Sequence, residues 1–355
     1  MKRIVLTGGG TAGHVSPNLA LLPHLLEKGY DVHYIGSARG IEREMTDLPG
    51  ITYHAIQSGK LRRYFDVKNF TDPFRVAAGC AQSLKLMKKL QPDVLFSKGG
   101  FVSVPVVWAA SKFHVPILCH ESDITPGLAN RISARYAKKI CATFPECAAK
   151  LGSKGVLTGT PLRPELFSGS REKGLALANF DGSRPVLLMM GGSQGAQAVN
   201  RALREALPDI TQEFDVLHLC GKGNEDAQLH GVKGYWQTPF LSAELPHALA
   251  ACDLVLSRAG ANAINEFQAL KKPMLLVPLP LSASRGDQIL NAQSYENRGI
   301  ARVLYQEEMT ADTLAQALRE TFAQRSRLLA ALDKEPAADG TQKVLQLIED
   351  IQKQH

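Results

Sequence analysis

The chain has 355 residues, of which 45% are hydrophobic, and its Lys and Arg exceed its Asp and Glu by 41 to 34, a net charge of +7. This length predicts two domains, since a domain usually has about 100–200 residues. The composition is ordinary for a soluble globular protein, and no apolar run approaches the ~18 residues of a membrane-spanning helix.

Predicted strands and helices alternate through the first half of the chain. We predict a strand at residues 3–7, a glycine-rich loop at 8–14, a helix at 16–28, strands at 31–35, 94–97 and 115–120, and a small-residue helix at 105–111. The apolar residues before the first glycines are too few for a signal peptide. The six cysteines include no Cys-x-x-Cys pair, so we expect reduced core residues in a cytoplasmic protein.

The pattern of the first 28 residues starts again at residue 185. It gives a strand at 185–190, a second glycine-rich loop at 191–195, a helix at 196–207, and strands at 216–219, 254–256 and 274–277. This alternation predicts an α/β fold with two doubly wound parallel-sheet domains, joined near residues 158–167. Ligands of such domains bind at the carboxyl ends of the strands, so we expect the site in a cleft between the two domains.

The segment from Ser257 to Glu266 suits an anion. It follows a buried strand with a turn of small residues and the start of a helix, where free backbone N–H groups and the helix dipole favour negative charge. Glu266 in the first turns of this helix could accept hydrogen bonds from vicinal sugar hydroxyls. Taken alone, the stretch favours the simpler interpretation of an ordinary strand-to-helix turn with a solvated glutamate.

The first glycine-rich loop spells G-x-G-x-x-G at Gly8, Gly10 and Gly13, the pattern of a dinucleotide-binding loop. That pattern expects an acidic residue at the end of the second strand, which here ends at residues 36–37 without one. His14 suits a general base in a cleft, because an unperturbed imidazole titrates near pH 7. A helix-capping or core histidine is an equally supported alternative.

Three further polar side chains could serve a phosphorylated sugar. Ser193 could add a hydroxyl around a phosphate, Arg163 could reach diphosphate oxygens, and Gln288 could bond sugar hydroxyls. Their alternatives are a turn serine, a surface ion pair and a helix cap. The sequence contains no Asp-x-Asp and no His/Cys cluster with metal-ligand spacing, so we expect no metal and no cofactor.

Together these motifs resemble the MurG family, within glycosyltransferase family 28. They occur in the family's order over nearly the whole chain: Gly-Gly-Thr-x-Gly-His-Val-x-Pro at 9–17, His-Glu at 120–121, Gly-x-Pro-x-Arg at 159–163, Gly-Gly-Ser-Gln-Gly at 191–195, and the turn at 258–266. The resemblance implies the GT-B fold, with residues 1–163 and 340–355 as the acceptor- and membrane-facing domain. Residues 164–339 would bind the UDP-sugar, and the last helix would return to the first domain.

The resemblance implies inverting transfer of N-acetylglucosamine from UDP-GlcNAc to the C4 hydroxyl of undecaprenyl-pyrophosphoryl-MurNAc-pentapeptide, the step from lipid I to lipid II. It implies a peripheral enzyme on the cytoplasmic face of the cell membrane, with cell-wall or division proteins as further partners. The alternatives are another UDP-sugar enzyme of this fold (a glycolipid glycosyltransferase or a UDP-GlcNAc 2-epimerase), an NAD(P)-dependent dehydrogenase, and a non-catalytic nucleotide-sugar binder.

The resemblance also implies roles for residues of this chain. His14 is the implied base, and Glu266 the implied ribose ligand. The other implied UDP-GlcNAc contacts are Thr11, Ala12 and Gly13 near the donor sugar and acceptor, Asp123 at the donor sugar, Arg163 and Ser193 at the diphosphate, the Leu241 backbone at uracil, Ala261, Asn262 and Ala263 at the phosphate, and Gln288 at the sugar hydroxyls. The chain departs from the family at Asp123, usually Asn, at residues 262–263, usually Leu-Thr, and at residues 287–288, usually a Gln pair.

Residues 60–89 carry most of the net charge. This window holds eight Lys or Arg and two Asp, with Leu61, Tyr64, Phe65, Phe70 and Phe74 interleaved. Such a segment can lie among the headgroups of an anionic membrane. The alternative, weighed for Phe70 and Phe74, is a solvated loop before an amphipathic helix whose Phe residues face the core. No recognition motif supports nucleic acid as the anionic partner.

Overall fold

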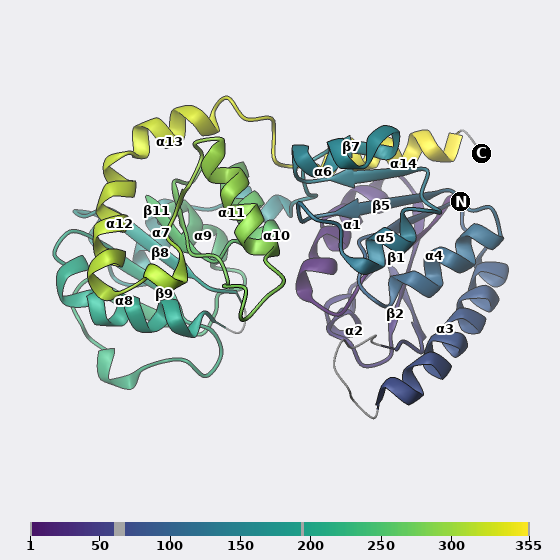
Figure 1. Cartoon of the computed structure of the whole chain (residues 1–355), viewed down its shortest axis with the longest axis horizontal. Coiled ribbons are helices and arrows are strands. Elements are labelled where there is room, and N and C mark those ends of the chain that lie inside the picture. The colour runs from purple at the N-terminus through teal and green to yellow at the C-terminus, as the bar shows by residue number, and fades with distance from the viewer. Residues whose placement is uncertain (1, 60–67, 193–194, 354–355) are drawn as a thin grey trace. The chain divides into compact units, whose positions relative to one another are not determined.

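The computed structural model describes residues 2–59, 68–192 and 195–353, with the side chains of residues 68–73 left out (Figure 1). The chain divides into two compact units, Met1–Arg163 with Asp339–His355 (unit 1) and Pro164–Ala338 (unit 2). Residue 339, predicted to fall in the second domain, thus belongs with the first. The ligand-binding roles of the two domains remain predictions.

Unit 1 is built on a seven-stranded parallel sheet in the order β3-β2-β1-β4-β5-β6-β7. Its strands are β1 Lys2–Thr7, β2 Tyr30–Ser37, β3 Ile51–Ile56, β4 Val94–Ser97, β5 Ile117–Glu121, β6 Lys139–Ala142 and β7 Gly155–Leu157. Its helices are α1 Ser16–Glu27, α2 Ile41–Met45, α3 Lys68–Leu90, α4 Ser103–Lys112, α5 Leu128–Ser133, α6 Pro145–Lys150 and α14 Thr341–Lys353. The strand order reverses between β1 and β4, which places the first glycine-rich loop at the switch point where such sheets bind ligands.

Unit 2 repeats this plan with a six-stranded parallel sheet in the order β10-β9-β8-β11-β12-β13. Its strands are β8 Val186–Met190, β9 Asp215–Leu219, β10 Tyr235–Thr238, β11 Leu254–Ser257, β12 Met274–Leu276 and β13 Arg302–Val303. Its helices are α7 Arg171–Ala176, α8 Gln197–Ile210, α9 Leu245–Ala251, α10 Ala261–Ala269, α11 Asp287–Asn297, α12 Ala311–Ala323 and α13 Arg325–Leu332. The order reverses between β8 and β11. The predicted α/β class with two doubly wound sheets is therefore confirmed.

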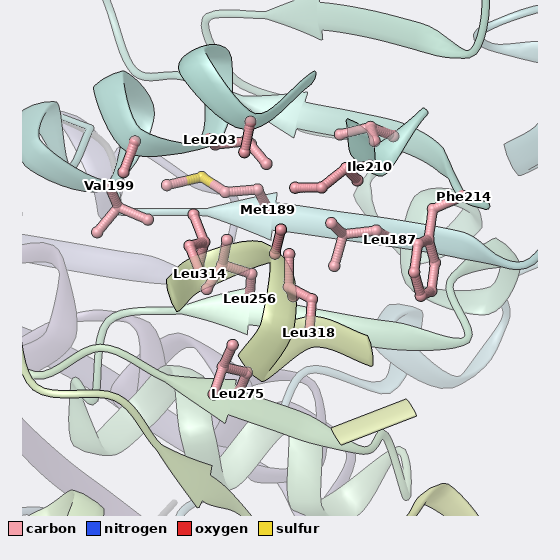
Figure 2. Close-up of a cluster of buried hydrophobic side chains, with 14 of the residues drawn as sticks. Leu187, Met189, Val199, Leu203, Ile210, Phe214, Leu256, Leu275, Leu314 and Leu318 are labelled. Atoms are coloured by element: carbon pink, nitrogen blue, oxygen red, sulfur yellow. The ribbon is translucent and has the colours of Figure 1, made fainter. Parts of the chain in front are cut away.

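The central strands are largely apolar because helices cover both faces of each sheet. Ile4, Val5 and Leu6 of β1 are all fully buried, although successive side chains point to opposite faces. In unit 2, Leu187 and Met189 of β8 pack among side chains of α8 and α12 (Figure 2). The core around β8 is thus formed by residues of unit 2 alone.

The helix α14, drawn in yellow in Figure 1, packs on unit 1 although unit 2 precedes it in the chain. Its apolar face, including Val344, Leu345 and Ile348, joins the core formed by β1, β4 and α1. The Lys28–Glu349 ion pair (2.6 Å) and the hydrogen bond from Tyr30 Oη to Gln352 Oε1 (2.8 Å) fix its outer side. None of the helices in the described ranges is both long and apolar enough to span a membrane.

Candidate functional site

The first glycine-rich loop leaves the carboxyl end of β1 and touches a second loop that follows β4. The Gly9 N–H donates to the Gly99 carbonyl (3.3 Å), so the two loops are joined backbone to backbone. Gly10 has a φ of +87°, and a Cβ there would lie 2.8 Å from the Phe101 ring. Only glycine fits this position, which explains one glycine of the motif in steric terms.

His14 ends the short 3-10 turn Ala12–His14, which connects the first glycine-rich loop to α1. The residue keeps some exposure to solvent, and the N-cap of α1 is Val15, so His14 is neither fully buried nor the cap of α1. Thr11 Oγ1 lies 3.0 Å from His14 Nδ1 and can orient the ring. The four predicted residues 11–14 thus lie together at the surface, where each is at least partly exposed to solvent.

The environment of His14 keeps its imidazole neutral. Burial and the positive charge of Lys98 lower the pKa of His14 to about 4, while a hydrogen bond with the Gly9 backbone and the charge of Glu42 oppose this shift. At pH 7 the ring is therefore unprotonated and available as a proton acceptor, although the lowered pKa makes it a weaker base than an ordinary histidine.

Lys98, which the sequence analysis did not single out, is a fully buried cation beside this group. It follows β4, is 1% exposed, and donates to Ser122 Oγ. Burial lowers the pKa of Lys98 to about 8, while the charges of Glu121 and Asp123 act in the opposite direction. The available signal was a lysine between a buried strand and a Gly-Gly pair, since such a residue lies at the ligand-binding edge of a parallel sheet.

Glu121 at the end of β5 holds the loop that carries Asp123. Its carboxylate accepts hydrogen bonds from Asp123 N (3.0 Å), Gly127 N (3.1 Å) and Asn130 Nδ2 (2.8 Å). Burial raises the pKa of Glu121, and the hydrogen bonds from Asn130 and from Asp123 N oppose part of that shift. Asp123, predicted to contact the donor sugar, is partly exposed, and its charge is felt by Lys98. The Asp123 carboxylate therefore interacts electrostatically with a buried cation.

In unit 2, the turn between β11 and α10 has the predicted strand-turn-helix form. Gly260 is the N-cap, and Ala261, Asn262 and Ala263 are the first three residues of α10. The start of a helix carries the positive end of the helix dipole, so this turn favours negative charge. Glu266 lies on the next turn and is partly exposed. The four predicted residues therefore share one helix start.

Arg258 in this turn has a structural role. It is 9% exposed and donates to the carbonyls of Val277 (3.1 Å) and Pro278 (3.2 Å) and to Gln306 Oε1 (2.6 Å). These bonds connect the end of β11 to the end of β12. Asn291 Nδ2 of α11 donates to the Ala259 carbonyl (3.2 Å) and connects α11 to the same turn.

Gln288 and Leu241, two further predicted ligands, lie in other segments of unit 2. Gln288 is the second residue of α11, and its Oε1 accepts from Leu279 N (3.1 Å), which leaves the amide N–H₂ end for a ligand oxygen. Leu241 lies between β10 and α9 and is partly exposed.

The two predicted diphosphate ligands are less fully defined. Arg163 is the last residue of the first segment of unit 1 and is exposed. The preceding residue, Leu162, is fixed by hydrogen bonds from its N–H to Asp339 Oδ1 (3.3 Å) and Thr341 Oγ1 (3.2 Å). Ser193 lies outside the described residues. Among the described side chains, no three His, Cys, Asp or Glu residues gather in a way that could hold a metal ion.

Comparisons with known proteins match this chain to a single family over nearly its full length. Residues 4–142 match the glycosyltransferase family 28 N-terminal domain, and residues 186–348 match the family's C-terminal domain. A protein of Lachnoclostridium phytofermentans named UDP-N-acetylglucosamine--N-acetylmuramyl-(pentapeptide) pyrophosphoryl-undecaprenol N-acetylglucosamine transferase is 54% identical, covering 99% of both chains. A Geobacillus thermodenitrificans protein of the same name is 52% identical, covering 98% of this chain and 99% of the other.

Solved structures extend the comparison to the fold. The crystal structure of Acinetobacter baumannii MurG superposes with a TM-score of 0.80 at 25% identity, covering 99% of this chain and 100% of that one. A UDP-GlcNAc 2-epimerase from Neisseria meningitidis bound to UDP-GlcNAc gives a TM-score of 0.67 at 12% identity, covering 99% and 100%. The second match shows a shared fold only.

Proposed function

The chain belongs to glycosyltransferase family 28, and from this we propose that it transfers N-acetylglucosamine from UDP-GlcNAc to the C4 hydroxyl of undecaprenyl-pyrophosphoryl-MurNAc-pentapeptide, with inversion at the sugar. The observation that carries the proposal is the identity of 48–54% over nearly the whole chain to relatives that carry this one enzyme name. A single displacement needs one base for the attacking hydroxyl, and the neutral, partly exposed His14 suits that task.

The donor is assigned to unit 2. The N-terminal residues of α10 would receive a phosphate with their backbone N–H groups, which suits a chain that lacks the usual Thr hydroxyl at residue 263. Glu266 would accept hydrogen bonds from the ribose hydroxyls, and the amide nitrogen of Gln288 would donate to a sugar oxygen. Arg163 and Ser193 would bind the diphosphate, the Leu241 backbone would pair with uracil, and Asp123 of unit 1 would contact the sugar.

The direct test incubates the full-length chain with UDP-GlcNAc, with and without a lipid-linked MurNAc-pentapeptide acceptor. We expect UDP release and a new disaccharide only when the acceptor is present, with a β linkage formed from the α-configured donor. Conversion of UDP-GlcNAc without acceptor would instead indicate a 2-epimerase, the alternative that shares the fold. Binding of UDP-GlcNAc without turnover would indicate a non-catalytic binder.

Replacing Glu266 with alanine should raise the donor KM about 10–150-fold, because a charge-assisted hydrogen bond of roughly 1.5–3 kcal/mol is lost. Steady-state kinetics with UDP-GlcNAc and its 2′-deoxyribose analogue measure this effect. The wild type should prefer the ribose donor, and Glu266→Ala should abolish most of that preference. Glu205→Ala, an exposed glutamate on α8, is the control. An unchanged ribose preference in Glu266→Ala would remove Glu266 from the donor site.

We also propose that the enzyme acts as a peripheral protein at the cytoplasmic face of the membrane, because its proposed acceptor is a lipid. Within the basic window, residues 60–67 lie outside the described residues, as do the side chains of residues 68–73, among them Phe70. The described part of α3 supports the proposal. Phe74 is 79% exposed, so it does not face the core, and Arg75, Lys85, Lys88 and Lys89 are exposed as well. All five fall within one ~140° arc of the helix.

Changing Lys85, Lys88 and Lys89 to glutamine should weaken binding to anionic vesicles about 10–100-fold, since each cation near such a surface contributes roughly 1 kcal/mol. Co-sedimentation with anionic and neutral vesicles at low and high salt measures the loss. The matched control changes three exposed lysines of unit 2, Lys173, Lys222 and Lys233, to glutamine. Equal losses in both variants, or binding that ignores lipid charge, would exclude this face of α3 as the membrane-binding surface.

A further inference from the structure

Glu42 is a buried carboxylate to which the proposed reaction gives no role. It lies on the short helix α2, is fully buried, and makes no ion pair within the described parts of the chain. A buried charge without a cation is costly unless hydrogen bonds satisfy it. The donors that do so here belong to the first glycine-rich loop and to the end of β2.

Three hydrogen bonds reach the Glu42 carboxylate. Gly10 N donates to Oε2 (3.1 Å), and Ser37 donates to Oε1 through both its backbone N (3.1 Å) and its Oγ (2.5 Å). The two backbone N–H groups can only donate, so both carboxylate oxygens act as acceptors here. A glutamine would place an N–H₂ group against either the Gly10 N–H or the Ser37 N–H, and one of the two contacts would be lost.

Glycines make room for this carboxylate. A Cβ at Gly9 would lie 2.6 Å from Glu42 Cδ, and a Cβ at Gly40 would collide with the carboxylate oxygens. Two glycines far apart in the sequence therefore let one side chain reach the loop backbone. The Glu42 side chain therefore requires a glycine at position 9, whether or not a ligand approaches the loop.

Each residue of the segment 8–10 is held from a different direction. Tyr34 Oη of β2 donates to the Gly8 carbonyl (2.7 Å), Gly9 N donates to Gly99 O (3.3 Å), and Gly10 N donates to Glu42. Gly10 is the residue of this segment that lies nearest to His14 along the sequence, and its contact is the only one of the three that involves a carboxylate. The 3-10 turn with His14 begins two residues after Gly10, and His14 also hydrogen-bonds with the Gly9 backbone, so the conformation of the segment 8–10 bears on the position of the imidazole.

We propose that Glu42 is a positioning residue for the transfer reaction: its carboxylate fixes Gly10 and thereby holds His14 where the acceptor hydroxyl is deprotonated. The inference rests on the proposed role of His14 as the base. It goes beyond that role because it names a second residue, the buried Glu42, that positions His14. The groups that act on the charge of His14 are Lys98 from the loop after β4, Glu42 from α2, and the backbone of Gly9.

The test compares Glu42→Gln with Glu44→Gln, which removes the same charge from an exposed position on the same helix. We expect Glu42→Gln to lower kcat about 10–100-fold with a nearly unchanged donor KM, since a displacement of ~1 Å can cost ~10²-fold. We expect Glu44→Gln to match wild type in both constants. A donor KM that rises as much as kcat falls would show a general loss of structure and would overturn the proposal.

Two further measurements separate positioning from instability. Amide hydrogen exchange followed by NMR should show faster exchange at Gly10 N–H in Glu42→Gln, with the amides of α4 unchanged. The His14 ring should titrate at a lower pH in Glu42→Gln and at a higher pH in Lys98→Met, because the removed charges have opposite signs. If Glu42→Gln does not fold, Ser37→Ala removes one donor to the same carboxylate, and we expect a smaller change in the same direction.

The outcomes distinguish this inference from the proposed function. If wild type transfers no sugar, or His14→Ala keeps full activity, the proposed reaction or its base is wrong, whatever Gly10 does. If transfer and His14 behave as proposed but Gly10 exchange and kcat are both unchanged in Glu42→Gln, the role of Glu42 is wrong.

Discussion

Replacing His14 with alanine should lower kcat about 10²–10⁴-fold, the usual effect of losing a general base. The acceptor C4 hydroxyl must lose its proton as it attacks, and the imidazole at this position is neutral at pH 7 because burial and Lys98 lower the pKa of His14 to about 4. Single-turnover assays under saturating UDP-GlcNAc and acceptor measure the chemical step. Donor binding, followed by the rise in melting temperature with UDP-GlcNAc, should be nearly unchanged.

The pH profile gives a second check on this base. A lowered pKa means that His14 loses its proton at a lower pH than an ordinary histidine, so the acid limb of kcat/KM should lie near pH 4 rather than near pH 6.5. The control is His230→Ala, an exposed histidine of unit 2. EDTA should not affect the rate, because backbone dipoles and arginine are proposed to bind the diphosphate. Near-wild-type turnover of a folded His14→Ala protein would exclude His14 as the base.

Replacing Ile348 with alanine should destabilise unit 1 by about 2–5 kcal/mol, the usual cost of truncating a fully buried isoleucine. Ile348 is 0% exposed and lies in the core that α14 shares with β1, β4 and α1. For a unit of this size, each kcal/mol lowers the melting temperature by about 2–4 °C, so we expect a shift of about 4–20 °C in the transition of unit 1.

Differential scanning calorimetry can follow this shift, because two units can give two transitions. Lys343→Ala, an exposed position on the same helix, should shift it by less than ~2 °C. Isolated loss of α14 with the remaining helices intact would contradict the view that α14 completes the core of unit 1.

The sequence predicted the fold well where a strand is fully buried. The apolar runs of β1, β8 and β11, each followed within two residues by glycine or alanine, have a continuous hydrophobic pattern because helices cover both faces. The strand β3 escaped prediction because it is an edge strand with the mixed sequence Ile-Thr-Tyr-His-Ala-Ile, most of it partly exposed. The strands β7 and β13 have three and two residues, too few to show any periodicity.

The candidate site was predictable only where a local motif marks it. His14 and the start of α10 are each found from one short stretch, whereas Glu42 meets Gly10 across 32 residues and Lys98 meets Ser122 across 24. Both contacts depend on which strands lie beside each other, and that order reverses at β1 and β4. A charged residue that is buried on a short helix or after a strand leaves no local sequence pattern. Only the three-dimensional structure reveals that such a residue is buried and what it contacts.

The placement of α14 also bears on how the protein is made. A ribosome delivers residues in order, so all of unit 2 has been synthesised before the helix that completes the core of unit 1 emerges. Unit 2 is one continuous segment and can fold during translation, whereas the first 163 residues must wait with part of their apolar surface uncovered. The core of unit 1 is therefore completed only after α14 has been translated.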